Sequence, residues 1–276
     1  MLVSGRELLA WAVERGCAVG SFNTYNLEVT RAIVRAAEAR RAPVFLAIGA
    51  GALDYAGFGV LTSASLEAAR EASVPVAVHL DHSPDVATLA KCAGAGFTSL
   101  MIDGHRLPFK GNVGLTREAV EASRGVVVEA ELGGVPGAED ASGAQVHDIP
   151  MTDPDEASRF VAATGVESLA IAIGNAHGVY SGEPHLDFGR LAELQEAVSV
   201  PLVLHGASGI ADEDIRRCIE LGVRKINVNT EIRQAFFESI GASIGSVKGY
   251  DVTKLLGSAV DAMAAVVEEK IGVFSG

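Results

Sequence analysis

The sequence has few basic residues, few aromatic residues and few cysteines, and each shortage excludes a class of protein. Its 276 residues include 22 Lys or Arg against 35 Asp or Glu, which gives a net charge of −13. A chain this acidic is not expected to bind nucleic acid or an anionic membrane surface, because both would repel it. An anionic substrate would need a local attraction from a metal ion, backbone N–H groups or a helix N-terminus.

The three cysteines, Cys17, Cys92 and Cys218, cannot form a disulfide framework. Their number is odd and no C-x-x-C pair occurs, which is typical of a protein kept in a reducing compartment. No apolar stretch is long enough to cross a membrane. The first 16 residues mix charged and apolar side chains, which indicates an amphipathic helix rather than a signal peptide. We therefore expect a cytoplasmic protein.

Short apolar segments, rich in β-branched residues, alternate with segments of helical spacing along the whole chain. Eight of them predict buried strands, at 18–22, 44–48, 76–80, 99–102, 126–130, 168–173, 202–204 and 224–228. No linker divides residues 1–276, so we predict one domain, a (β/α)₈ barrel with extra helices at both ends. A doubly wound open sheet is the alternative, but no G-x-G-x-x-G follows the first strand.

The segments between these strands predict helices, a glycine-rich loop and two long loops, one at 133–150 and one from the sixth strand to Leu186. Helices are expected at 6–14, 28–41, 64–72, 84–93, 115–124, 154–164, 188–198 and 212–221, with more helix from 231 and over 253–271. A glycine-rich loop is expected after the second strand, through Gly59. The long segment 133–150, rich in Gly, Ala and acidic residues, is typical of a lid or binding loop.

Three histidines follow three separate predicted strands. His82 follows the third strand, His177 the sixth and His205 the seventh. Parallel strands of a barrel end on the same face, where the active sites of such barrels are built. Three imidazoles with a fourth position left open are typical of a catalytic zinc site.

Acidic residues occupy the same strand ends. Asp81 immediately precedes the first of these histidines, while Asp103 and Glu131 end the fourth and fifth predicted strands. Capping or salt bridging would explain either of the last two residues taken alone. Their clustering on the C-terminal face instead favours a place in the active site.

Two glycine- and asparagine-containing loops predict a phosphate site. Residues 206–209, Gly-Ala-Ser-Gly, follow the seventh strand, and residues 227–230, Asn-Val-Asn-Thr, end the eighth. The loops after these two strands commonly bind phosphate in this fold, through close backbone approach and helix N-terminal N–H groups. The alternative is that the glycines serve a turn and Thr230 is only a helix cap.

A metal beside a phosphate site suggests Lewis-acid chemistry on a phosphorylated carbonyl compound, as in a metal-dependent aldolase. Asp81 could move a hydroxyl proton, and Glu139 or Asp140 in the long loop a carbon-bound one. A barrel metallohydrolase is an alternative, but residues 21–23 lack the His-x-His common in its first strand. A non-catalytic accessory subunit is another, yet it would not need the three histidines.

Six motifs together resemble those of the class II, zinc-dependent ketose-bisphosphate aldolases, in both the fructose and tagatose branches. The similarity is collinear from Gly20 to Ile271. The motifs are His79-Leu80-Asp81-His82, Met101-Ile102-Asp103-Gly104, Val128-Glu129-Ala130-Glu131-Leu132-Gly133, Ala176-His177-Gly178, Leu204-His205-Gly206-Ala207-Ser208 and Asn227-Val228-Asn229-Thr230.

The resemblance implies reversible cleavage of a ketose 1,6-bisphosphate, or a related ketose 1-phosphate, to dihydroxyacetone phosphate and an aldehyde such as glyceraldehyde 3-phosphate. It makes Asp81 the acid/base at the C4 hydroxyl and Glu139 the acid that handles the C3 proton. The implied zinc ligands are His82, His177 and His205, with Asp103 and Glu131 in an alternative or second metal site. The implied substrate contacts are Asn23, Gly178, Gly206, Ala207, Ser208, Asn227, Val228, Asn229 and Thr230. A monovalent cation, Na⁺ or K⁺, near the carbonyls of Gly178 and Ser208, and a homo-oligomer, dimer or tetramer, are also implied.

The chain departs from the family pattern mainly on the aldehyde side. Gly49 stands where members carry a serine or threonine that serves the second phosphate, and Thr253 where many carry an arginine. Pro136 precedes the acidic pair of the long loop in place of a glycine, and His105 replaces a common serine. Unless Arg106 or Lys110 supplies a cation, weak discrimination between ketose 1-phosphates and bisphosphates is expected. The configuration at C4 is not encoded in any of these motifs.

Overall fold

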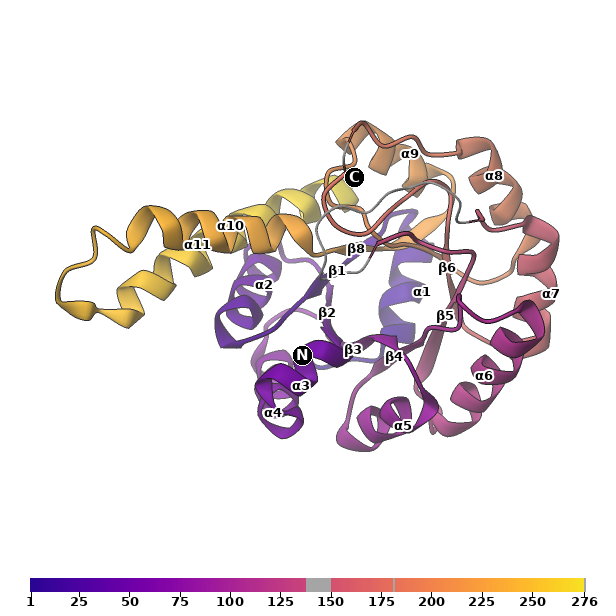
Figure 1. Ribbon diagram of the computed structural model, residues 1–276, viewed down its shortest axis with the longest axis horizontal. Helices are drawn as coiled ribbons and strands as arrows, with labels where there is room; N and C mark the ends of the chain where they lie inside the picture. Colours follow the sequence, from indigo (N-terminus) through magenta and orange to yellow (C-terminus); the bar gives the residue numbers. More distant parts are fainter. Residues whose placement is uncertain (138–149, 181, 276) are drawn as a thin grey trace.

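The computed structural model describes residues 1–137, 150–180 and 182–275, and eight parallel strands form a closed barrel in chain order (Figure 1). Glu139 and Asp140 lie outside the described residues. The strands are β1 Val19–Asn23, β2 Val44–Gly49, β3 Val76–Ser83, β4 Ser99–Ile102, β5 Val127–Leu132, β6 Ser168–Ile171, β7 Leu202–Leu204 and β8 Val223–Val228. The predicted barrel is confirmed, and the open-sheet alternative is excluded by the pairing of β1 with β8.

Helices surround the barrel, with one before the first strand and two after the last (Figure 1). They are α1 Gly5–Arg15, α2 Leu27–Arg40, α3 Ala50–Ala56, α4 Phe58–Glu71, α5 Val86–Ala95, α6 Phe109–Ala122, α7 Pro154–Thr164, α8 Phe188–Ala197, α9 Asp212–Glu220, α10 Thr230–Ser243 and α11 Val252–Phe274, with a 3₁₀ turn η1 at Lys248–Tyr250. No helix of the described chain is long and apolar enough to cross a membrane.

The strands are apolar on both faces because both faces are covered. In β2, Leu46 and Ile48 pack outward in the cluster shared with the helices, whereas Phe45 packs in a separate cluster with Leu8 and Leu9 of α1. Alternate residues of a strand point to opposite faces, so a continuous apolar run suits this arrangement.

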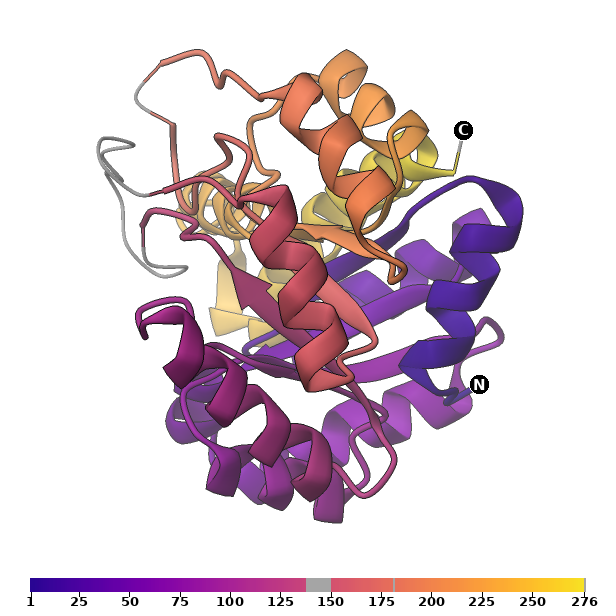
Figure 2. The same ribbon diagram turned by 90° about the vertical axis from the view of Figure 1, so that its right-hand side faces the viewer.

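Helix α1 closes one end of the barrel and leaves the other end for the site. Ser4 and Glu7 form a capping box at its start, and Gly16, at φ 63°, ends it. Figure 2 shows α1 (dark indigo) on the side of the barrel opposite the loops that follow the strands. The C-terminal ends of the strands are therefore the face on which polar groups can meet a substrate.

The expected glycine-rich loop through Gly59 is wrong, because α3 and α4 occupy most of it. Gly49 and Gly57 flank α3, and between them Ala52 and Leu53 are buried against the barrel. The glycines thus mark the helix ends, while burial of the alanine- and leucine-containing segment favours helix between them. The helix expected at 115–124 also begins earlier, at Phe109, directly after Pro108.

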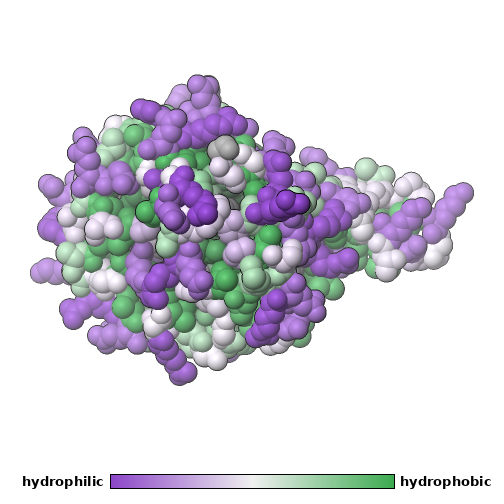
Figure 3. All heavy atoms as spheres, turned by 180° about the vertical axis from the view of Figure 1, so that it is seen from behind, coloured by the Kyte–Doolittle hydropathy of each residue, from purple (hydrophilic) through white to green (hydrophobic). Residues whose placement is uncertain are grey.

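The last two long helices form an arm that projects from the barrel. Helices α10 and α11 pack against each other, α11 packs on α2, and their far ends extend beyond the body of the molecule (Figure 1). Figure 3 shows the arm from behind, with hydrophilic and neutral residues over much of its tip. The break expected near residues 245–249 is the turn between the two helices.

Candidate active site

The third strand carries two of the predicted site residues at consecutive positions. It runs past residue 80, where we expected it to end, to Ser83, and its register against β4 shifts between Leu80 and Ser83. His82 lies in the left-handed region at φ 44°, a strained conformation that tends to occur at functional sites. Neighbours in a regular strand point to opposite faces, so this irregularity allows both Asp81 and His82 to reach the barrel centre.

The three predicted histidines converge. His82 Nε2 and His205 Nδ1 are 2.9 Å apart, and the ring centroids of His82 and His177 are 5.0 Å apart. One ligating nitrogen from each of the three lies within 4.8 Å of the other two. His177 Nε2 is buried and has no hydrogen-bond partner among the described residues. Imidazole nitrogens that face one another and an orphaned buried nitrogen fit a metal ion held by three histidines.

A buried ion pair orients His205. Glu129 Oε1 lies 2.8 Å from His205 Nε2, and Glu129 Oε2 accepts a 2.9 Å hydrogen bond from Lys225 Nζ. Burial raises the pKa of Glu129, but Lys225 and His205 outweigh it and hold that pKa below its usual value. The carboxylate thus places the imidazole proton on Nε2 and leaves Nδ1 free for a metal.

Sequence reasoning missed Glu129 and Lys225 as functional residues. A usable signal existed, because both are charged residues inside β5 and β8, strands that are otherwise buried on both faces. Charged groups are almost never fully buried without a partner. Glu129 and Glu131, two apart in β5, also point to the same face of the strand.

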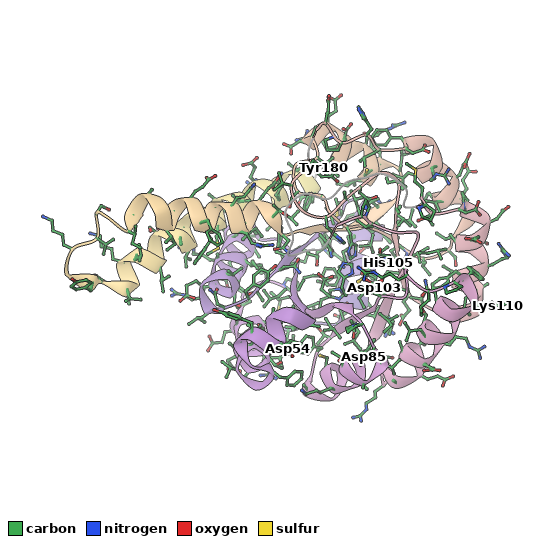
Figure 4. All side chains as sticks on the ribbon, viewed as in Figure 1. Asp54, Asp85, Asp103, His105, Lys110 and Tyr180 are labelled. Atoms are coloured by element: carbon green, nitrogen blue, oxygen red, sulfur yellow. The ribbon has the colours of Figure 1, made fainter. Side chains whose placement is uncertain are left out.

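Asp103 orients His82 in the way that Glu129 orients His205. Asp103 Oδ2 is 3.0 Å from His82 Nδ1, and its Oδ1 accepts from His105 Nδ1 at 2.6 Å. His105 and Asp103 lie side by side at the centre of the barrel in Figure 4. The hydrogen bond to Asp103 raises the pKa of His105. Asp103 therefore orients one of the three converging imidazoles, although His82, Asp103 and Glu131 also form a second group with metal-ligand spacing.

Asp81 is held between two amides. Asn23 Nδ2 donates to Asp81 Oδ2 at 2.8 Å, and Asn227 Nδ2 donates to Oδ1 at 3.2 Å. Burial raises the pKa of Asp81, but the imidazoles of His82 and His205 outweigh it and hold the pKa below its usual value. The carboxylate is therefore ionised, which is the form that can accept a proton. Asn23 and Asn227, expected to touch substrate, hold this carboxylate directly.

A small glycine-lined hollow lies beside His177, at the predicted phosphate loops. We call it the glycine hollow, and it is lined by His177, Gly178, Gly206, Ser208, Asn227, Asn229 and Thr230. At Gly206, φ is 62° and a Cβ would collide with the backbone carbonyl of Ala176, so only glycine fits. Three of the nine predicted contacts do not line it: Asn23 donates to Asp81 instead, Val228 is buried in β8, and the Ala207 N–H donates to the Asn227 carbonyl at 3.2 Å.

Helix α10 begins beside this hollow. Asn229 occupies its N-cap position and Thr230 is its first residue, so the alternative role of Thr230 as the cap is wrong. The Ser208 hydroxyl accepts from the Asn229 N–H at 3.3 Å, which fixes the two loops to each other. A helix N-terminus next to a glycine-lined hollow is a favourable place for an anion.

A larger cavity of about 220 Å³ is lined by Asp81 and His82, and it shares His177 with the glycine hollow. We call it the large cavity. The ends of β2 and β4 contribute Gly49, His105 and Arg106 to its lining. Lys110, the other cation considered for this side, lies at the outer edge of the molecule in Figure 4. The cation available to this cavity from the β4–α6 loop is therefore Arg106.

Replacing Glu129 tests the orientation of His205. We expect Glu129→Gln to weaken metal binding by roughly 10- to 100-fold, the usual effect of removing a carboxylate behind a metal-bound histidine. It should also lower the free energy of unfolding by about 3–5 kcal/mol, because the Lys225 charge would be buried without its partner. Chelator competition and denaturant unfolding measure the two effects.

Glu167→Gln is the matched control, since Glu167 pairs with Arg6 where both side chains are partly exposed. Surface pairs contribute about 0–1 kcal/mol, so neither quantity should change much in this variant. An unchanged metal affinity in Glu129→Gln would show that His205 does not depend on this carboxylate.

Comparisons with known proteins agree with this geometry. The family model of class-II fructose-bisphosphate aldolases matches residues 3–276. A fructose-bisphosphate aldolase of Thermus caldophilus is 42% identical over 99% of this chain and 98% of its own length. A D-tagatose-1,6-bisphosphate aldolase subunit, GatY, of Klebsiella oxytoca is 44% identical over 87% of this chain and 85% of its own.

A solved structure shows the same fold. The YdjI aldolase of Escherichia coli K12 superposes with a TM-score of 0.88 at 37% identity, covering 99% of this chain and 97% of that one. The metallohydrolase alternative is excluded by these matches, which extend over the whole barrel. The chain belongs to the class-II fructose-bisphosphate aldolase family.

Proposed function

We propose that the protein is a zinc-dependent aldolase that reversibly cleaves a ketose 1,6-bisphosphate of the fructose or tagatose type, or a related ketose 1-phosphate. The products are dihydroxyacetone phosphate and an aldehyde, which is glyceraldehyde 3-phosphate for a bisphosphate. The observation that carries this proposal is the convergence of His82, His177 and His205 beside the buried, ionised Asp81. The glycine hollow supports it as the place for the C1 phosphate.

His82, His177 and His205 would hold the zinc ion. Bound there, zinc would polarise the substrate carbonyl oxygen as a Lewis acid. Asp103 and Glu131, with His82, form a second candidate group for a metal in another position. We also propose a monovalent cation, Na⁺ or K⁺, near the carbonyls of Gly178 and Ser208, as in some members of the family.

Cleavage of the C3–C4 bond requires two proton movements. The C4 hydroxyl must lose its proton as its oxygen becomes the aldehyde oxygen, and C3 must receive one. Asp81, ionised and held by Asn23 and Asn227, is placed to take the first proton. We assign the second to Glu139, on the family resemblance, since it lies outside the described residues.

The donor half of the substrate would lie with its phosphate in the glycine hollow. Gly206 allows the backbone to approach closely, and the start of α10 supplies the favourable end of a helix dipole. Gly178, Ser208, Asn229 and Thr230 line this hollow and would surround the phosphate. The chain's net charge of −13 would otherwise repel such a ligand.

We further propose a homo-oligomer, a dimer or a tetramer, in the cytoplasm. Large apolar side chains are exposed on the arm and on α3 nearby, which is typical of a protein–protein interface. They are Tyr55, Phe237, Ile244, Tyr250 and Val252. All three cysteines are free and buried, which suits a reducing compartment. Light scattering of the purified protein would measure the subunit number.

Retro-aldol assays on fructose and tagatose 1-phosphates and 1,6-bisphosphates, with and without zinc, test the proposal. We expect cleavage to depend on the metal and to return when zinc is restored to stripped protein. The preferred sugar would also identify the C4 configuration. A metal-loaded protein that cleaves none of the four would contradict the proposal and favour an accessory subunit.

A further inference from the structure

The glycine hollow and the large cavity would divide the substrate between them. If the C1 phosphate lies in the glycine hollow, the remainder of the sugar would extend past His177, which lines both spaces, into the large cavity beside Asp81 and His82. The aldehyde half would therefore contact residues at the C-terminal ends of β2 and β4. At the end of β2 stands Gly49, which has no side chain with which to bind an anion.

The lining of the large cavity carries one permanent cation. Among its described residues Arg106 is the single lysine or arginine, and the carboxylates Asp81 and Asp103 line the same cavity. An anionic end of the aldehyde half would be repelled by those carboxylates. The guanidinium of Arg106 is the group that offsets this repulsion.

Within the described chain, the side chain of Arg106 keeps its hydrogen-bond donors for a ligand. No hydrogen bond or ion pair joins its side chain to another residue in the part of the chain that the structure describes, whereas Arg6 and Arg190 pair with Glu167 and Asp187. Nearby Asp103 is already occupied, because its carboxylate accepts from His82 and His105. The five N–H donors of a guanidinium match the oxygens of a phosphate or carboxylate.

The loop that carries Arg106 is held in place. Asp103 Oδ1 accepts from the backbone N–H of His105 at 3.1 Å as well as from its ring. The Leu107 N–H donates to the Gly104 carbonyl at 2.9 Å and closes a turn around the arginine. His105, where the family commonly has serine, thus anchors the loop to the site.

We propose that Arg106 recognises an oxyanion, a phosphate or a carboxylate, at the end of the aldehyde half remote from its carbonyl. This inference rests on the proposed aldolase function. Thr253 cannot do this within one chain, because it lies exposed at the start of α11 in the arm and does not line the cavity. The acceptor specificity of this chain therefore depends on its own β4–α6 loop.

The ratio of kcat/KM for the ketose 1,6-bisphosphate to that for the 1-phosphate tests the inference. A charge-assisted hydrogen bond to the second phosphate favours the bisphosphate, and solvent screening at an exposed arginine limits this preference. Together the two effects predict a ratio of roughly 10 to 30 in the wild type. Arg106→Ala should bring the ratio to about 1 through a higher KM for the bisphosphate, with the 1-phosphate unchanged. Arg106→Lys should restore part of it, and added salt should lower the wild-type ratio.

Lys110→Ala is the matched control, a cation four residues further along, in the first turn of α6, whose side chain lies at the outer edge (Figure 4). Its ratio should equal that of the wild type. A ketose 1-phosphate with a carboxylate at the far end distinguishes the two oxyanions. The substrate whose kcat/KM falls in Arg106→Ala is the one that carries the oxyanion that Arg106 recognises.

The two proposals fail differently. If the zinc-loaded wild type cleaves none of these sugars, the proposed function is wrong and this inference with it. If the wild type cleaves them but Arg106→Ala keeps the wild-type ratio for both the phosphate and the carboxylate, this inference alone is wrong.

Discussion

His205→Ala should yield a protein that no longer retains the roughly one divalent ion per chain expected of the wild type. In the structure the Nδ1 of this histidine faces the Nε2 of His82 at 2.9 Å, and its other nitrogen is already bonded to Glu129. Removing the ring takes away one of three ligands. Without the ion, the transition state would lose several kcal/mol of stabilisation at the substrate carbonyl, and turnover would fall by roughly 10³-fold or more.

Elemental analysis of dialysed protein, together with turnover, measures this effect. His185→Ala is the matched control, because His185 is an exposed histidine outside the metal group. It should keep both metal and activity. Full metal content in His205→Ala would show that the ion is held elsewhere and would overturn the proposed ligand set.

Asp81→Asn should keep the metal and lower turnover by roughly 10²–10⁴, the usual effect of losing a general acid/base. An amide has nearly the same shape as a carboxylate but cannot accept the C4 hydroxyl proton. Asn23 and Asn227 both donate to Asp81, so the new amide would place an NH₂ group against one of these donors. A loss of about 1–3 kcal/mol in the free energy of unfolding should accompany the loss of turnover.

Asp85→Asn provides the comparison for this variant. Asp85 caps α5 by accepting from the Thr88 N–H, and asparagine caps a helix about as well as aspartate. Its turnover and stability should therefore stay near those of the wild type. Wild-type turnover in Asp81→Asn, or loss of its metal, would remove the acid/base role from this residue.

The barrel could be predicted because its signals are local. Runs such as Val76–Leu80 are short, apolar and β-branched, and their alternation with helical segments needs no knowledge of distant contacts. The segment after β2 was misjudged for the same reason. Ala52 and Leu53 form helix α3 because they are buried against the barrel. The glycines near them indicate a loop when only the local sequence is considered.

The glycine hollow was partly predictable in the same way. Gly206 adopts a positive φ in a loop where glycine is expected, and Ser208 and Thr230 lie where strand ends meet helix starts. Which backbone groups remain available could not be predicted. The Ala207 N–H is taken by the carbonyl of Asn227, a contact between two loops that the order of residues does not reveal.

By itself, the sequence determined that His82, His177 and His205 would share one face, because all strands of a parallel barrel end on the same side. Only the tertiary structure decided how these imidazoles are oriented. Glu129 meets His205 across 76 residues and Lys225 across 96, and such pairs exist only once the strands have closed around a common interior. The same closure decided that Arg106 lines the large cavity while Lys110 lies outside it, since Arg106 is in the β4–α6 loop and Lys110 is on the exposed surface of α6.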